Sequence, residues 1–197
     1  MIARCYTRQS LPSKAVRLLE VITRDHADFK AIEEVYTDLA RMAFEASNWK
    51  VVSDACAGFI AKFPNSERIP YMNLYAAAAQ VGSGNIEAGT AALRVLAGQT
   101  TYEDVKAGAY YHLAITSLRS DKFDLEETLD LLRKSIACYP EAKALLQAAK
   151  CACDLKKWAL AQEYVDQFTR DFSKSDRRLL EDMQDVRQRI TAGLKKR

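Results

Sequence analysis

Three short stretches of the sequence contain residue types that could carry chemistry. Cys151-Ala-Cys153 could bind a metal ion or form a redox pair, Gly82-Ser-Gly84 could cradle a phosphate, and Glu126-Glu127 could act as an acid–base pair. Each of these functions needs further residues nearby. A metal ion needs more ligands, a phosphate loop needs a preceding strand and a following Lys-Ser or Lys-Thr, and a catalytic pair needs a nucleophile or a second reacting group.

None of the three stretches has these further residues. Residues two apart on a helix point about 200° away from each other, so the two cysteines cannot bind one ion, and His26 and His112 belong to other parts of the chain. No strand pattern precedes the glycines, so a turn accounts for them. Acidic residues at a helix start suit the helix dipole. The sequence therefore predicts a protein that is not an enzyme and has no cofactor or metal.

Cysteine usage and apolar patterning bear on the compartment. The five cysteines form an odd set without a disulfide-framework spacing, and each lies in a predicted helix, which favours a reducing, cytoplasmic location. No apolar run reaches the roughly 20 residues that cross a bilayer, and the N-terminal sequence has no signal-peptide core. We therefore expect no membrane insertion. The cysteines are Cys5, Cys56, Cys138, Cys151 and Cys153.

Composition indicates a helix-rich chain that does not bind nucleic acid. The sequence is 49% hydrophobic and 28% charged, with seven glycines and four prolines. Few runs alternate apolar and polar residues with a period of two, so an all-α structure without sheet is predicted. The net charge is +3, but acidic residues outnumber basic ones between residues 28 and 173. A phosphate-binding groove is not expected on such a body.

The chain repeats a pair of helices. The clearest copy covers residues 102–140, where a helix from about Tyr102 to Leu118 and a polar break lead to a second helix that ends at Pro140. Three columns of residues, spaced by about 37, bring the copies into register. They are Ala3, Ala40, Ala77, Ala114 and Ala149 in the first helices; Ala15, Val52, Gly89, Thr128 and Ala161 early in the second helices; and Ala27, Pro64, Thr101, Pro140 and Ser173 after the second helices.

Small residues in two columns predict close helix crossings, and the third column predicts where each second helix ends. The resulting repeats are 1–30, which is incomplete, then 31–67, 68–101, 102–140 and 141–174. They form one solenoid over 1–197, with at least ten helices. Residues 175–197 are expected to form a capping helix with a basic tail, started by Ser173 and apolar from Leu179 to Leu194. Because the first repeat is incomplete, we expect either that this chain is cut from a longer protein or that a partner or a second copy covers the end.

This pattern resembles the tetratricopeptide repeat (TPR) family over essentially the whole chain. Its period of 37 exceeds the family's average of about 34, and such long repeats are similar to those of bacterial cell-envelope TPR proteins. The resemblance implies a right-handed α-solenoid of antiparallel helix pairs, and leaves a periplasmic location open as the alternative. The residues that carry it best are Tyr110, Leu113, Ala114, Thr128, Leu132, Pro140, Ala149, Trp158 and Ala161.

The resemblance also implies a concave groove lined by the first helices, which would bind a protein or peptide. The carried-over site residues are Arg41, Tyr71, Tyr75, Tyr111, His112, Lys143 and Lys150. The tyrosines either contact the partner or pack between repeats. Paired lysines and asparagines that clamp heat-shock chaperone tails in part of the family are absent. Their positions here are Thr37, Arg41, Leu74, Ala78, Tyr111, Ile115, Leu146 and Lys150.

The predicted function is therefore a binding scaffold or adaptor without chemistry of its own, working within a multiprotein assembly. The alternative is an RNA-binding helical-repeat protein of the pentatricopeptide kind, which has a similar period but needs basic, base-reading grooves.

Overall fold

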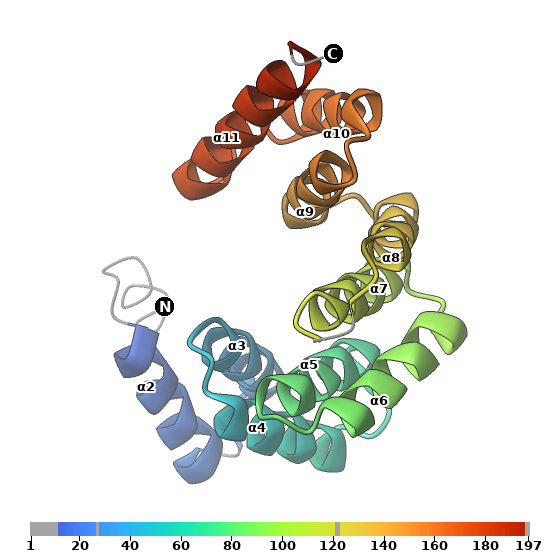
Figure 1. Cartoon of the computed structure of the whole chain (residues 1–197). Helices are drawn as coiled ribbons and strands as arrows, with labels where there is room; N and C mark the ends of the chain where they lie inside the picture. The colour runs from blue at the N-terminus through green and yellow to red at the C-terminus, as the bar shows by residue number, and fades with distance from the viewer. Residues whose placement is uncertain (1–11, 27, 121–122, 196–197) are drawn as a thin grey trace. The chain divides into compact units, whose positions relative to one another are not determined.

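The computed structural model describes residues 12–26, 28–120 and 123–195 (Figure 1). These residues form ten helices and no strand, which confirms the predicted all-α, TPR-like fold. The predicted helix around Ala3, the uncovered end beside it, Cys5, Ala27 and the last basic residues lie outside the described part. The helices are α2 (Pro12–Asp25), α3 (Ile32–Glu45), α4 (Trp49–Lys62), α5 (Ile69–Gly82), α6 (Ile86–Gln99), α7 (Glu103–Ser117), α8 (Leu125–Cys138), α9 (Ala142–Asp154), α10 (Trp158–Asp171) and α11 (Arg177–Leu194).

The chain divides into two compact units, Met1–Leu96 and Ala97–Arg197, each with a core of its own. In the first unit, α3 packs against α2 and α4, and α4 packs against α5. In the second unit, α7 packs against α8, α8 against α9, and α9 against α10, while α11 packs on both α9 and α10. Short connections between packed neighbours produce the expected antiparallel helix pairs.

The two helix columns lie at buried crossings, as predicted. Gly89 of α6 shows why small residues are needed there: a Cβ atom on it would lie 2.8 Å from the backbone O of Ala77 and 2.6 Å from Cγ2 of Val81. Such a contact leaves no room for a side chain, because backbone cannot move aside as a flexible side chain can. The described members, each at most 2% exposed except the buried Gly89, are Ala15, Ala40, Val52, Ala77, Gly89, Ala114, Thr128, Ala149 and Ala161.

Side-chain caps mark the starts of α8 and α11. The Asp124 carboxylate accepts hydrogen bonds from the backbone N–H groups of Glu126 and Glu127, at 2.8 and 3.4 Å, so this acidic pair occupies the first turn of α8. At the start of α11, the cap is Asp176, which accepts from the N–H of Arg178 at 2.9 Å. The prediction that Ser173 starts this helix is wrong. A turn from Phe172 to Ser175 separates Ser173 from the helix.

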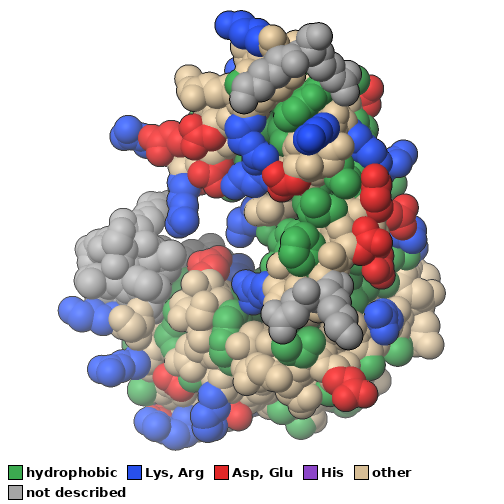
Figure 2. Space-filling model, viewed as in Figure 1, with side chains coloured by type: hydrophobic (Ala, Val, Ile, Leu, Met, Phe, Trp, Pro, Cys, Tyr) green, Lys and Arg blue, Asp and Glu red, His purple; other side chains and the backbone are tan. Residues whose placement is uncertain are grey.

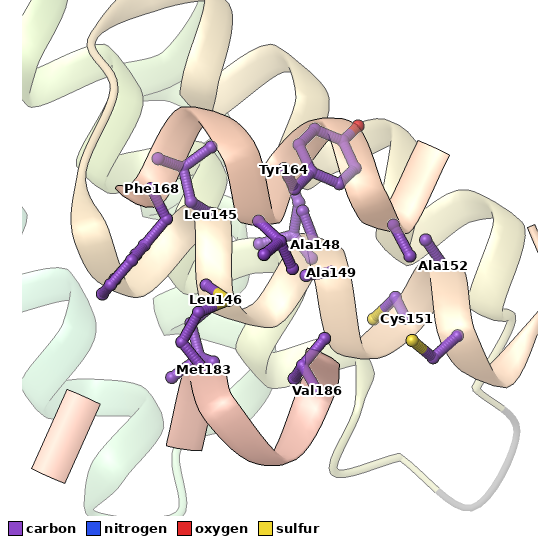
Figure 3. Packing of buried hydrophobic residues seen from close by; sticks show 14 of the residues in the cluster. Leu145, Leu146, Ala148, Ala149, Cys151, Ala152, Tyr164, Phe168, Met183 and Val186 are labelled. Carbon is purple, nitrogen blue, oxygen red and sulfur yellow. The ribbon is translucent and has the colours of Figure 1, made fainter. Parts of the chain in front are cut away.

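The second core surrounds α9, which is buried on several sides (Figure 3). Leu145 lies beside Phe168 of α10, and Leu146 lies beside Met183 of α11. Both faces of α9 are covered, and for this reason Cys151 and Cys153 are both only 2% exposed although they point in different directions. Helix α11 buries Met183, Val186 and Ile190 and exposes its charged face, as expected for a cap.

Two tryptophans occupy the wedge between successive helices, as predicted for Trp49. A Cβ atom on Gly82 of α5 would lie 2.6 Å from the indole of Trp49, at the start of α4. The same arrangement recurs between α11 and α10, because a Cβ atom on Gly193 would clash with the indole of Trp158. Helix α11 therefore packs on α10 as α5 packs on α4. Because Gly193 faces the indole, the neighbouring Leu194 points away and is 54% exposed, contrary to its predicted place in the apolar line.

Candidate binding pocket between the first helices

A cavity of about 420 Å³ lies between α3 and α5, the first helices of two successive predicted repeats. It contains three of the predicted site residues, Arg41 from α3 and Tyr71 and Tyr75 from α5. Both tyrosines are half-buried, so each has a packed part and an accessible part. The complete lining is Thr37, Asp38, Arg41, Arg68, Tyr71, Met72 and Tyr75.

The turn between α4 and α5 fixes one end of this pocket. The Ser66 hydroxyl donates to the Glu33 carboxylate of α3 and accepts from the backbone N–H of Arg68 at 3.1 Å. The Arg68 guanidinium then donates from Nη1 to Oγ1 of Thr37 at 3.4 Å. Pro70 suits the first turn of α5, where no backbone N–H is needed. These contacts connect the turn to α3 and place Arg68 at the pocket.

Arg41 is held between two carboxylates on its own helix. Its Nη2 lies 2.9 Å from Oδ1 of Asp38 and its Nη1 lies 3.2 Å from Oε1 of Glu45, and its side chain is 38% exposed. Burial lowers the pKa of Arg41, but the hydrogen bond to Asp38 and the charge of Glu45 outweigh this effect and raise it overall. Arg41 is thus an oriented donor whose charge is already compensated.

Aromatic packing supports the other end of the pocket. The ring of Tyr75 lies 5.5 Å from the ring of Phe44, and Phe44 lies 5.4 Å from Trp49 in an edge-to-face arrangement. This packing holds the α5 side chain from behind while its accessible part lines the pocket. The two alternatives for the tyrosines, packing or contact with a partner, are therefore compatible for Tyr75.

The other four predicted residues belong to the second unit. Tyr111 and His112 lie next to each other on α7, with ring centroids 5.5 Å apart and an edge-to-face angle of 72°. Lys143 is exposed near the start of α9. Lys150 pairs with Asp182 of α11 at 3.1 Å. A surface shared by these residues and the α3–α5 pocket stays a prediction, because each unit is described separately.

Helix α11 covers part of the groove surface that was predicted for residues 141–174. Leu146, which the family resemblance places in the groove beside Lys150, is 2% exposed and packs in the core with Met183. Its neighbour on that column, Lys150, is held by the ion pair to α11. The inward column of this repeat therefore serves to dock the last helix.

Sequence reasoning missed Arg68, Asp38 and Met72. Arg68 precedes the proline-containing start of α5 and lies outside the helical register from which the groove was predicted. Its position before a predicted first helix is the signal that could have identified it. Asp38 could have been identified from its i, i+3 spacing to Arg41.

The sequence also raised the possibility of a metal site, reactive cysteines and a membrane span, and each can be examined in the described residues. No three His, Cys, Asp or Glu side chains gather there into a metal-binding group. Four cysteines are free, and burial raises the pKa of Cys56 to about 12 and that of Cys151, with a smaller effect from Asp154, to about 11. Within the same residues, no helix is long and apolar enough to cross a bilayer.

His112 should make stability depend on pH. Burial, with the positive charges of Lys143 and Arg119, lowers its pKa to about 4, whereas an unfolded histidine titrates near 6.5. The unfolded chain then binds more protons between these values, so the stabilisation is complete above about pH 6.5 and is lost as the pH falls towards 4. Urea unfolding at pH 7 and pH 5 should show a smaller loss for His112→Gln than for the parent chain. An NMR titration midpoint near 6.5 for His112 would contradict this.

No family model and no curated protein sequence matches this chain. Solved structures of MamA, a TPR-repeat protein, do match. A MamA RS-1 ArsTM double mutant has a TM-score of 0.53 at 15% identity, and the match covers 95% of this chain and 91% of that chain. MamA 41-end from Desulfovibrio magneticus RS-1 has a TM-score of 0.52 at 17% identity, and the match covers 89% of this chain and 94% of that chain. The comparison supports a TPR-like helical-repeat fold.

Proposed function

We propose that this protein is a non-enzymatic scaffold or adaptor that holds a peptide or protein partner on its first helices, within a multiprotein assembly. The observation that supports this most directly is the α3–α5 pocket. Its volume of about 420 Å³ falls in the range of pockets that enclose a ligand, roughly 300–1,000 Å³. The TPR-like fold agrees with a protein-binding role.

The pocket chemistry suits a peptide better than a reacting substrate. Two tyrosines offer large apolar contact areas with polar tips, and such residues dominate the energetics of protein interfaces. Met72 also borders the pocket, but at 0% exposure it supports the lining from within the core. Arg41 and Arg68 supply donors at fixed positions. No nucleophile accompanies a base among the lining residues, so binding is the activity that this constellation supports.

Truncating Tyr75 should weaken partner binding by about 2 kcal/mol or more, the usual effect of removing a central aromatic anchor. A pull-down with mass spectrometry would identify the partner, and calorimetry would then compare the parent chain with Tyr75→Ala. Tyr139→Ala is the matched control, because Tyr139 follows the second helix α8 and is 52% exposed. Circular dichroism should show that both variants are folded. Greater weakening by Tyr139→Ala would place the interface elsewhere.

The RNA-binding alternative requires a continuous basic track and receives less support. The α3–α5 pocket has two arginines and one aspartate, and Arg41 is already paired. Figure 2 shows Lys and Arg side chains beside Asp and Glu side chains on the drawn face. Filter binding with mixed single-stranded RNA tests this alternative. Tight binding that weakens steeply with salt would favour RNA over a peptide.

We extend the proposal to a cytoplasmic location, with an envelope location as the alternative. It is supported by the four free cysteines of the described residues, three of them buried, whose pKa values are all raised, mainly by burial. Such thiols remain protonated and reduced in a reducing compartment. Fractionation of the source cells with an antibody to the protein would test this. Recovery in the envelope fraction would contradict it.

A further inference from the structure

Arg68 borders two cavities of the first unit. One is the α3–α5 pocket, and the other has a volume of about 490 Å³. Arg68 is the residue that the two linings have in common. An extended ligand that occupies both cavities would therefore contact Arg68. The second lining consists of Phe29, Lys30, Ala31, Glu33, Glu34 and Arg68.

Arg68 differs from Arg41 in its charge partners. It makes no ion pair with any described residue, and its side-chain partner is the neutral hydroxyl of Thr37. Arg41, in the same pocket, pairs with two carboxylates. The backbone of Arg68 is nevertheless fixed through Ser66. A positioned guanidinium with unused N–H donors is well suited to bind a carboxylate in a planar, two-point contact.

Apolar side chains lie on both sides of this cation. Phe29, in the second cavity, is 51% exposed, so its ring is available to a ligand. On the other side, Tyr71 and Tyr75 are half-buried in the α3–α5 pocket. Each cavity therefore combines an aromatic lining with the cation that both cavities share.

Nearby acids restrict what can bind. Glu34 and Asp38 line the two cavities on either side of Arg68, and Glu33 accepts the hydrogen bond from Ser66. A ligand with a run of acidic residues would place some of them against these carboxylates, and like charges at short range repel. A single acidic residue at Arg68 avoids this repulsion.

We propose that the two cavities together bind one peptide segment in which a single Asp or Glu lies between two apolar side chains. The ligand carboxylate pairs with Arg68, one apolar side chain packs on Phe29, and the other enters the pocket beside Tyr71 and Tyr75. This inference rests on the proposed function and names the chemistry of the partner segment.

A displayed library of random twelve-residue peptides, selected on the purified full-length protein, tests the inference. The parent chain should enrich peptides with one acidic residue flanked by apolar ones. An enriched peptide would then be synthesised with its acid intact and with that acid replaced by its amide. Fluorescence anisotropy should show about fivefold weaker binding of the amide peptide, the size of effect expected for a partly exposed ion pair.

Variants of the protein, tested against the same two peptides, show whether Arg68 is the group that binds the acid. Arg68→Gln should weaken the acidic peptide about fivefold and leave the amide peptide unchanged. Arg94→Gln is the matched control, because Arg94 is an exposed arginine of α6 that lines neither cavity. Phe29→Ala and Tyr75→Ala should each weaken the binding of the acidic peptide and of the amide peptide, since the two peptides have the same apolar side chains.

The outcomes separate this inference from the proposed function. Peptide binding that depends on Tyr75 but shows no acid preference, or prefers acidic runs, overturns the inference and leaves the proposed function in place. Equal effects of Arg68→Gln on the two peptides also overturn it. Selected peptides whose binding is unaffected by Tyr75→Ala contradict the proposed pocket itself.

Discussion

Replacing Phe168 by alanine should lower the free energy of unfolding by about 3–5 kcal/mol, the usual cost of removing a buried aromatic side chain. Phe168 is 1% exposed and lies in the core that joins α9, α10 and α11, beside Leu145 (Figure 3). Its loss would leave a cavity among three helices that depend on one another for burial. Urea unfolding followed by circular dichroism would measure the change.

A surface aromatic residue of the same unit serves as the control. Phe123 is 52% exposed, so Phe123→Ala should change stability by less than about 0.5 kcal/mol. Because the two units have separate cores, hydrogen exchange should show the loss for Phe168→Ala mainly in residues 97–195. A decrease of less than about 1 kcal/mol in the free energy of unfolding would contradict the burial of Phe168 between α10 and α9.

Replacing Gly89 by valine should destabilise the first unit by about 3 kcal/mol or more, at the upper end of overpacking costs. Even the first added carbon would lie 2.6 Å from the Val81 side chain and 2.8 Å from both the Ala77 O and the Val81 N. Relief would require α5 and α6 to separate, because two of these three atoms belong to the backbone. Thermal and urea unfolding would measure the effect.

The same helix offers a matched control. A Cβ atom on Gly98 would meet nothing within 4 Å, and Gly98 is exposed. Valine and glycine differ by only about 0.5 kcal/mol in helix propensity, so Gly98→Val should have little effect or a slightly stabilising one. Similar losses for the two variants would show that helix propensity, and not the crossing at Gly89, controls the result.

Part of the site could be predicted from the sequence. The repeat register assigned Arg41, Tyr71 and Tyr75 to the groove. They line one pocket because residues three or four positions apart lie on the same face of a helix. Arg68 escaped this reasoning because it precedes α5, and a turn has no period from which its direction can be inferred. Its contact with Thr37 depends on how the α4–α5 turn packs on α3.

The last repeat shows how packing changes the role of a predicted position. The register placed Leu146 and Lys150 on the groove, but α11 packs on α9, buries the leucine and pairs with the lysine. A register specifies the direction in which a side chain points. It does not specify which later segment of the chain will cover that side chain.

The sequence by itself determined the helix pairs, their approximate ends and the small residues at their crossings. These features follow from local rules: apolar periodicity, proline at helix ends, and the lack of room for a side chain where two helices touch. The tertiary structure alone decided which side chains share a cavity, that Arg41 pairs with carboxylates whereas Arg68 forms no ion pair with a described residue, and that both faces of α9 are buried. Those properties depend on distances between residues that are far apart in sequence, and such distances exist only once the helices have packed.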